Sequence, residues 1–184
     1  TVKPEVDTDE ITNYEFGWKT ITKDGQLRFN GSAFYVDVTG LQSTIFDPSI
    51  VNLFFSDNAA DATIKGVEGD FTYFTNIEGL SVAGAFSFLD TEITEKLVPT
   101  NDVVVGEELA FAPGMQGNVR VRQEWGMTAG NVGHLQVQFT YSDDSFSDIM
   151  EPNKARQASY SYIDLRAGIT NDDLTAELYV DNVT

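Results

Sequence analysis

Strict alternation of apolar and polar side chains constrains the fold of this chain more than any other feature. In the run 80–90, apolar residues occupy one face and small or polar residues the other, which is the period of two that a pleated strand requires. The preceding run 64–75 alternates in the same way, and residues 76–79 (Asn-Ile-Glu-Gly) between the runs have turn chemistry. The stretch 58–92 therefore predicts a long β-hairpin with one apolar face and one charged face.

The same alternation recurs along the whole chain and predicts about eight strands in an all-β, antiparallel, up-and-down meander. Asp24-Gly25, the strongest short hairpin signal, separates the first two of these runs. The eight runs are 14–22, 26–38, 64–75, 80–90, 115–125, 135–141, 163–170 and 174–181.

Short and long connections alternate between the predicted strands. The short ones are 24–25, 76–79, 128–131 and 171–173, and the long ones are 43–61, 93–113 and 142–159. We interpret 43–61 as a long loop with room for one short strand, because it contains Pro48 and several Asp and Asn residues. If neighbouring strands are antiparallel, every short turn lies at one end of the sheet and every long connection at the other, as in an outer-membrane β-barrel.

A soluble β-sandwich is the alternative, since its apolar faces would meet in a core. Greek-key sandwiches do not usually keep a short-long rhythm, and the polar faces here mix both charges with Gly, Ser, Gln and Asn, as a hydrated lumen does. Aromatic residues also gather near strand ends, as in an interfacial girdle. These residues are Tyr14, Trp18, Tyr35, Tyr73, Trp125, Tyr141 and Tyr160.

The charged side chains on the polar faces bear on the size of the barrel. They are Glu15, Lys19, Arg28, Glu68, Asp70, Arg120, Arg122, Glu124, Asp164, Arg166 and Glu177. A closed barrel of about eight strands has an interior only just filled by side chains, so these charges would need nearly complete pairing there. We therefore favour an arc of a wider, hydrated barrel, with a small closed barrel as a further alternative.

Charge and cysteine usage exclude some partners and cofactors. The chain of 184 residues has 29 acidic and 11 basic residues and a net charge of -18, which disfavours nucleic acid as a partner. It has no cysteine, so a disulfide framework or a thiolate metal site is excluded. The chain begins without Met or an apolar signal segment, from which we expect that processing or truncation removed what came before.

Catalysis and metal binding find little support in the residues. His134 is the only histidine, and no Ser or Asp forms a recognisable nucleophile motif with it, so we expect a surface position and no catalytic residues. The acidic run 143–148 lacks the glycine and the terminal Glu of an EF-hand loop, so we expect a solvated loop. No metal site or cofactor is predicted.

Five short segments, taken in order, resemble a known family. They are 2–19 (VKPE followed by TNYEFGWK), 33–42 (AFYVD leading to GLQ), 58–68 (NAADA with IKGVE), 109–113 (LAFAP) and 178–184 (LYVDNVT). In this order and spacing, the chain resembles the TonB-dependent outer-membrane receptors, and specifically the carboxy-terminal part of their barrel of about 22 strands.

The resemblance implies one β-domain over 1–184, a barrel fragment without the plug domain and without the final strand. It implies a bacterial outer-membrane protein that is not an enzyme and that contacts the lipid bilayer and lipopolysaccharide. Its ligand would be a small, scarce nutrient such as a ferric siderophore, vitamin B12 or a glycan, imported with energy from the TonB system through the plug region. The alternative is a secreted β-sandwich that binds carbohydrate or a protein partner through its loops.

The resemblance also suggests site residues. Ligand contacts would lie on the first two long connections, at Phe46, Phe54, Phe55, Asp102, Glu107 and Glu108. The lumen-facing residues Glu68, Asp70, Arg120, Arg122 and Glu124 would face the plug or pair with one another across neighbouring strands.

Overall fold

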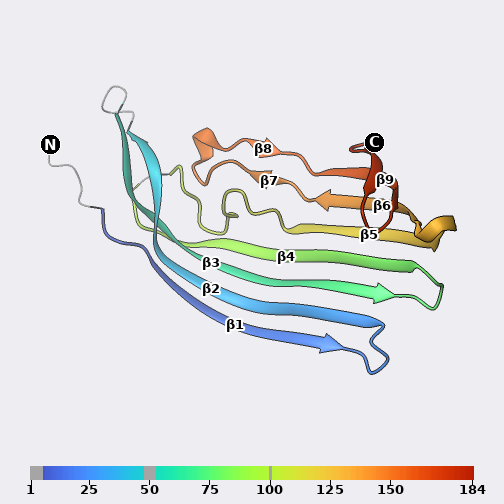
Figure 1. Cartoon of the computed structure of the whole chain (residues 1–184). Helices are drawn as coiled ribbons and strands as arrows, with labels where there is room; N and C mark the ends of the chain where they lie inside the picture. The colour runs from blue at the N-terminus through green and yellow to red at the C-terminus, as the bar shows by residue number, and fades with distance from the viewer. Residues whose placement is uncertain (1–5, 48–52, 100) are drawn as a thin grey trace.

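The chain folds around one curved antiparallel sheet of eight strands, in the order β1-β2-β3-β4-β5-β6-β9-β10 (Figure 1). The computed structural model describes residues 6–47, 53–99 and 101–184, and it leaves the side chains of 46–47 and 53–55 undescribed. The sheet strands are β1 Glu10–Ile21, β2 Leu27–Asp47, β3 Leu53–Phe74, β4 Leu80–Lys96, β5 Met115–Gly126, β6 Val132–Ser142, β9 Tyr160–Thr170 and β10 Thr175–Val180. The predicted eight-stranded meander is confirmed.

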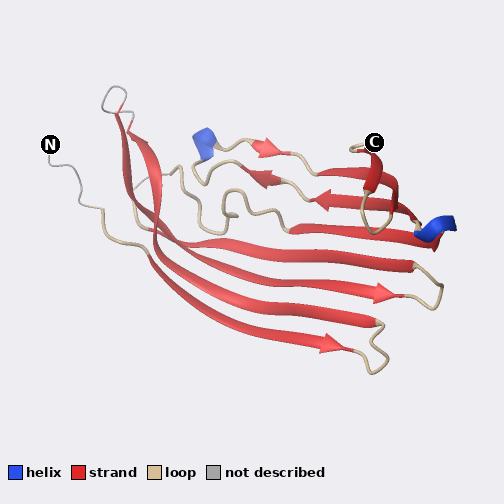
Figure 2. Ribbon diagram, in the orientation of Figure 1, coloured by secondary structure: helices blue, strands red, loops and turns tan. Residues whose placement is uncertain are grey.

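The remaining elements are small. A two-stranded sheet pairs β7 (Ser145–Phe146) with β8 (Arg156–Gln157) inside the connection between β6 and β9. Two short 3-10 segments, η1 (Thr128–Gly130) and η2 (Glu151–Asn153), make up the helix within the described ranges (Figure 2). No helix there is long and apolar enough to cross a membrane.

The two ends of the sheet differ as the sequence predicts. The short turns gather at one end of the sheet, on the right in Figure 1, and the longer connections lie at the other end. In the first turn Gly25 adopts a φ of 73°, and the Asp24 Oδ1 accepts hydrogen bonds from the Thr22 hydroxyl (2.5 Å) and the Gln26 N–H (3.0 Å). Asp-Gly therefore supplies the left-handed residue that a tight hairpin turn needs.

The expectation of a long loop over 43–61 is wrong. Strand β2 continues to Asp47 and β3 begins at Leu53, and their backbones pair through Ser43↔Asp57 and Ile45↔Phe55. Register shifts between Val38 and Gln42 mark a bulge where the two strands leave the regular sheet. Ala59 and Ala60 are consecutive residues of this extension and both are fully buried, so burial there does not follow the period of two that the sequence would reveal.

The apolar face of the sheet is exposed. Phe16 is 72%, Phe139 45% and Val121 42% accessible, and none of Phe29, Val82 and Phe86 is buried. A β-sandwich would bury these residues against a second sheet, and a small closed barrel would join β1 to β10, whereas each of these strands has one neighbour. Both alternative folds are therefore wrong.

The height of the apolar face matches a bilayer. Tyr35 and Leu27 are eight residues apart on β2. At about 3.3 Å per residue and a tilt of about 40°, this separation corresponds to about 20 Å along a barrel axis. Apolar residues continue toward the turns at positions such as Leu135, which is 49% exposed. They bring the height of the apolar face near the roughly 25 Å that is typical of outer-membrane barrels.

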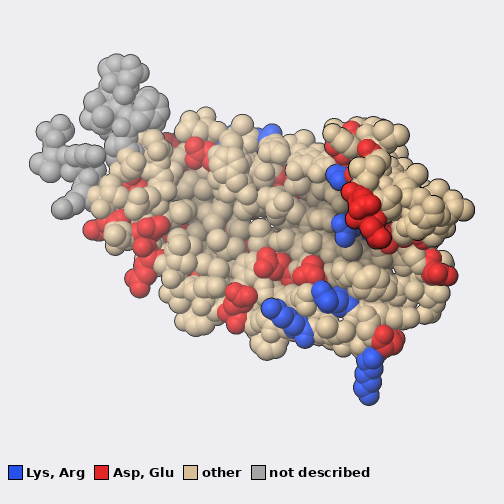
Figure 3. Space-filling model, in the orientation of Figure 1, with Lys and Arg blue, Asp and Glu red and all other residues tan. Residues whose placement is uncertain are grey.

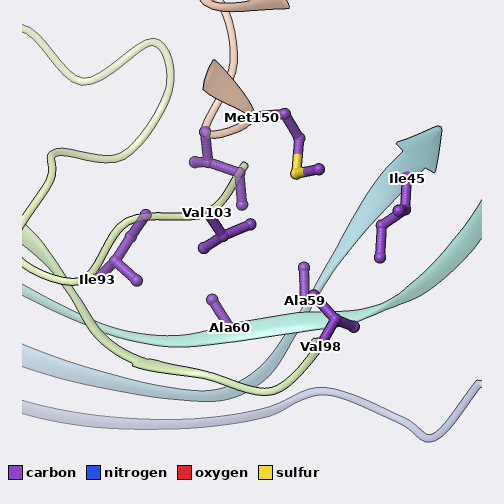
Figure 4. Packing of buried hydrophobic residues seen from close by; sticks show 8 residues of the cluster. Ile45, Ala59, Ala60, Ile93, Val98, Val103 and Met150 are labelled. Carbon is purple, nitrogen blue, oxygen red and sulfur yellow. The ribbon is translucent and has the colours of Figure 1, made fainter. Parts of the chain in front are cut away.

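A small buried core lies at the long-connection end, away from this apolar face. The connections 97–114 and 142–159 pack on β2, β3 and β4 there, and the Leu109 N–H donates to the Thr91 hydroxyl (3.0 Å). Figure 4 shows side chains from both connections pointing toward those of the strands. The cluster consists of Ile45, Ala59, Ala60, Ile93, Val98, Val103, Ile149 and Met150.

Glycines in the sheet lie under aromatic rings of neighbouring strands. A Cβ on Gly31 would stand 2.5 Å from the ring of its cross-strand partner Trp18, and one on Gly69 would stand 3.0 Å from the ring of Phe86. The absence of a side chain lets each ring lie flat against the sheet. Further pairs of this kind are Phe34/Gly66, Phe71/Gly84, Trp125/Gly133 and His134/Gly168.

Candidate functional site

The polar face of the sheet forms a broad concave groove. It has a volume of about 830 Å³ and runs across the sheet from Lys19 on β1 to Tyr160 on β9. Small residues such as Gly17, Ala85 and Ser87 make room for it. The face is therefore suited to contact a polar partner and water, not to form a dry core.

Charged and amide groups on this face form short local networks. The Arg122 Nε donates to Glu124 Oε1 (2.8 Å) on the same strand, and its Nη1 donates to Gln136 Oε1 on β6 (3.4 Å). Asp70 accepts from the Asn30 amide (3.1 Å). Figure 3 shows acidic and basic side chains close together, with acidic ones more frequent on the visible face.

The predicted lumen-facing residues all lie on the polar face. Glu68 accepts a hydrogen bond from the Ser32 hydroxyl (3.3 Å), and Arg122 pairs with Glu124. Among these five residues, the ion pair that forms joins Arg122 and Glu124 within β5, not residues of neighbouring strands. Contact of Glu68, Asp70, Arg120, Arg122 or Glu124 with a plug stays a prediction.

His134 is buried, so the expected surface position is wrong. Its side chain is 3% exposed, and its Nε2 lies 2.9 Å from Glu177 Oε2 on β10. Arg166 on β9 lies on the other side of that carboxylate, 3.5 Å from Glu177 Oε1. The ring covers Gly168, so the glycine of the intervening strand makes room for a link from β6 to β10.

At the opposite end, Lys154 joins two long connections. Its Nζ donates to Glu107 Oε2 (2.6 Å) in the 97–114 connection and to Glu151 Oε1 (3.1 Å) in its own, while lying 4.5 Å from the centre of the Phe146 ring. Burial alone would lower the pKa of Lys154, but the bonds to the two carboxylates outweigh it and raise the pKa. The lysine thus stays charged and holds the connections together.

A second ion pair stabilises the β7–β8 hairpin. Arg156 Nε donates to Asp144 Oδ2 at 2.7 Å. This hydrogen bond lowers the pKa of Asp144 and raises that of Arg156. The expectation of a solvated acidic run is therefore incomplete, because Asp144 is engaged and Asp148 accepts the Met150 N–H (3.0 Å).

The predicted ligand contacts are spread over this end of the molecule. The backbones of Phe46 and Phe54 pair across β2 and β3, while the side chains of Phe46, Phe54 and Phe55 lie outside the described residues. Glu107 is held by Lys154, and the Asp102 carbonyl accepts the Glu151 N–H (2.8 Å). Glu108 is exposed. Asp102 and Glu107 thus tie connections together, and ligand contact by any of the six stays a prediction.

A second groove of about 460 Å³ lies between the β2–β3 extension and the two long connections. Phe111, 73% exposed, lines it and has a left-handed backbone (φ 56°), with its N–H bonded to the Phe146 carbonyl (2.8 Å). Sequence reasoning missed this groove, because a phenylalanine between two alanines carries no signal for positive φ.

Within the described residues, no group of three or more His, Asp or Glu side chains could hold a metal ion.

Comparison with solved structures supports the fold. The ferric yersiniabactin uptake receptor FyuA from Yersinia pestis is 20% identical, with a TM-score of 0.71 over 95% of this chain and 25% of that one. The siderophore receptor PiuA from Acinetobacter baumannii is 17% identical (TM-score 0.70; 97% and 25%), and the ferric preacinetobactin receptor BauA from the same species is 19% identical (0.68; 94% and 25%). The chain thus spans about a quarter of their length.

Comparison with families gives a direct assignment. No curated protein matches the chain. The family model described as TonB dependent receptor-like, beta-barrel matches residues 4–183. The eight-stranded meander, the exposed apolar face and the polar groove agree with that match, and the chain belongs to the TonB-dependent receptor β-barrel family.

Proposed function

We propose that this chain forms part of the barrel wall of a receptor that imports a scarce nutrient across the bacterial outer membrane with energy from the TonB system. Its family is one of outer-membrane receptors and transporters, not enzymes, which places the chain in the bacterial outer membrane. The nutrient would be a ferric siderophore, vitamin B12 or a glycan. Of the solved structures named above, FyuA is a ferric yersiniabactin uptake receptor, PiuA a siderophore receptor and BauA a ferric preacinetobactin receptor.

The observation that carries this proposal is the contrast between the two faces of one sheet. Large apolar side chains such as Phe16 and Phe139 are exposed on one face, while the other carries a groove lined by polar residues such as Lys19, Asp70 and Asn118. In water the apolar face would be a large aggregation-prone surface, whereas in a bilayer it is solvated by lipid. The polar face would then enclose the lumen.

The polar groove also supports contact with a plug. Its lining has both signs of charge and several amides, which suits a polar partner that fills a hydrated barrel. The connections at the long end would receive nutrient from outside, since short turns of such barrels face the periplasm and longer loops face the exterior. The bilayer and lipopolysaccharide would contact the apolar face and its outer rim.

The test is a nutrient-uptake assay on the bacterium that carries this gene. The gene is deleted, and uptake of labelled ferric siderophores, vitamin B12 and oligosaccharides is compared with that of the parent strain, with and without a protonophore. We expect uptake of one nutrient to fall at least tenfold on deletion and to need the proton gradient. Complementation with the complete gene is the control.

Two results would count against the proposal. Unchanged uptake of every nutrient tested would contradict the import role. Recovery of the gene product in the soluble fraction, without detergent, would contradict the membrane-facing assignment of the apolar surface.

A further inference from the structure

We propose that the groove beside Phe111 binds a neutral, hydroxyl-rich ligand, a saccharide, with the Phe111 ring as its stacking surface. This inference rests on the proposed function and narrows its three candidate nutrients to one, a glycan.

The groove is built by four separate parts of the chain. Ser43 and Thr44 come from β2, Ser56 from β3, and Leu109 and Phe111 from the 97–114 connection. The 142–159 connection adds Asp148. A volume of about 460 Å³ lies within the range of about 300–1,000 Å³ that small-molecule sites occupy.

The core and the ion pairs beneath fix these parts relative to one another. Leu109 packs against the buried cluster that contains Ile93 and Val103, and Ile149, beside Asp148, belongs to that cluster. Lys154 bridges the two connections. The groove is therefore largely formed before a ligand arrives, which reduces the ordering cost of binding.

Phe111 is the unusual residue of the groove. A large aromatic side chain is 73% exposed there, on a backbone with a φ of 56° that L-residues other than Asn, Asp and His rarely adopt. The bond from its N–H to Phe146 O and the packing of Leu109 hold it in place. Residues held in such sparsely populated backbone conformations cluster at active sites and ligand-binding sites.

The charges around the groove disfavour an anionic ligand. The connections 97–114 and 142–159 carry seven acidic residues and two basic ones. Both basic residues, Lys154 and Arg156, are already paired with carboxylates, and none of the described residues lining the groove is Lys or Arg. Anionic chelates are typically held by Arg or Lys, which donate charged hydrogen bonds.

The groups that do line the groove suit a sugar. The C–H bonds of a pyranose ring carry small positive partial charges that favour the negative face of an aromatic ring. Hydroxyl groups both donate and accept hydrogen bonds, and three residues with hydroxyl side chains, Ser43, Thr44 and Ser56, are among those that line the groove. Asp148 uses Oδ1 to accept from Met150, which leaves its second oxygen as a strong acceptor for a sugar hydroxyl.

The experiment uses the complete gene product, purified in detergent, and an array of oligosaccharides. The neutral members are gluco-, galacto-, manno- and xylo-oligosaccharides, and the anionic members are sulfated and sialylated ones. Ferric citrate and ferric desferrioxamine are tested separately by fluorescence quenching. We expect retention of at least one neutral oligosaccharide class and no retention of the anionic ones.

Variants assign that binding to the groove. Phe111→Ala and Phe111→Gly remove the ring, and we expect both to weaken oligosaccharide binding at least tenfold. Glycine tolerates the positive φ, so Phe111→Gly separates loss of the ring from backbone strain. Phe111→Tyr keeps the aromatic face and should retain binding. Val105→Ala is the matched control, because Val105 is 53% exposed on the same connection and does not line the groove.

Asp148→Asn tests the acceptor, with Asp172→Asn in an exposed turn at the other end as its control. We expect a threefold to tenfold loss for Asp148→Asn and no change for Asp172→Asn. Thermal unfolding, followed by circular dichroism, checks that each variant is folded.

The outcomes separate this inference from the proposed function. If the array retains no neutral oligosaccharide, or if folded Phe111→Ala and Phe111→Gly bind as well as the wild type, the saccharide site is wrong. Deletion of the gene could then still abolish uptake of a siderophore, which would leave the import role standing. Loss of neutral-oligosaccharide binding in both Phe111 variants, with Phe111→Tyr and Val105→Ala unchanged, supports the inference.

Discussion

The two halves of the sheet are organised by opposite rules. Toward the short turns, apolar side chains such as Val119 and Phe139 are exposed on one face, and polar ones line a groove on the other. Toward the long connections, the apolar residues Ile93 and Val103 are buried, at 0% and 2% exposure. The first half leaves its apolar surface uncovered, whereas the second covers its own with folded connections.

This difference shows that the surroundings of a strand determine what its sequence reveals. Where one face meets lipid and the other water, every second residue changes character. Where folded connections pack on the strands, consecutive residues such as Ala59 and Ala60 can both be buried, so burial no longer follows a period of two. The predictions below test each half separately.

The largest effect is expected in the half that has its own core. Ile93→Ala removes a fully buried side chain between β4 and the connections, which should cost roughly 2–5 kcal/mol of local stability. Hydrogen exchange of residues 97–114 and 142–159 measures the loss. Val105→Ala, on an exposed part of the same connection, should change exchange by less than about 0.5 kcal/mol.

In the other half, Val119→Arg places a charge on the apolar face. If that face meets lipid, the free energy of folding into vesicles should become less favourable by roughly 2–4 kcal/mol. Asn118→Arg is its control, because the neighbouring position lines the polar groove. Equal effects of the two substitutions would contradict the assignment of the faces.

Gly31→Ala tests the close approach of rings to the sheet. The added Cβ would meet Trp18 at 2.5 Å and the Glu68 carbonyl at 2.7 Å, so overpacking should destabilise the barrel by about 1–3 kcal/mol. Gly126→Ala is matched to it, since a Cβ at that strand position meets nothing within 4 Å. Denaturant unfolding in vesicles should show Gly126→Ala to be neutral or slightly stabilising.

Lys154→Met removes the cation between two connections while keeping much of its apolar length. Glu107 and Glu151 are nearly half exposed and can be hydrated, so the loss of local stability should be only about 1–2 kcal/mol. Protease cleavage within 142–159 should accelerate, while unfolding of the half of the sheet toward the short turns should stay unchanged. Simultaneous loss of both halves would show that they form one cooperative unit.

The smallest effect concerns pH and the Asp144–Arg156 pair. Because the folded pKa of Asp144 lies below its usual value of 3.8, the pair contributes stability that is fully present above that value. The contribution is lost as the pH falls through the lower, folded pKa. Exchange of the β7–β8 amides should therefore increase below about pH 4, and Asp144→Asn should abolish this pH dependence.

The sequence predicted the half of the sheet toward the short turns well. The turn at 76–79, the eight strands and the two faces follow from period-two alternation and turn residues, both of which are local signals. The β2–β3 extension could not be predicted in this way, because Ala59 and Ala60 are buried by residues from distant connections. Strand pairing there depends on long-range packing that no local pattern records.

The candidate site was less predictable for related reasons. His134 carries no local sign of burial, since its partner Glu177 is 43 residues away and its space is provided by Gly168. Phe111 has a left-handed backbone and lines a groove formed where two connections meet in space, and neither feature leaves a local pattern in the sequence. The lumen-facing charges were easier to find, because they alternate with apolar neighbours along single strands.

The rings that lie over glycines restrict which substitutions this sheet can accept during evolution. Trp18 and Gly31 share one volume, so enlarging the glycine creates a clash and shrinking the tryptophan opens a gap. The residue types at the two positions of each such pair, which lie on neighbouring strands, are therefore constrained together. The double substitution Trp18→Gly with Gly31→Trp keeps the total side-chain volume of the pair. Each single substitution, however, gives a less stable barrel.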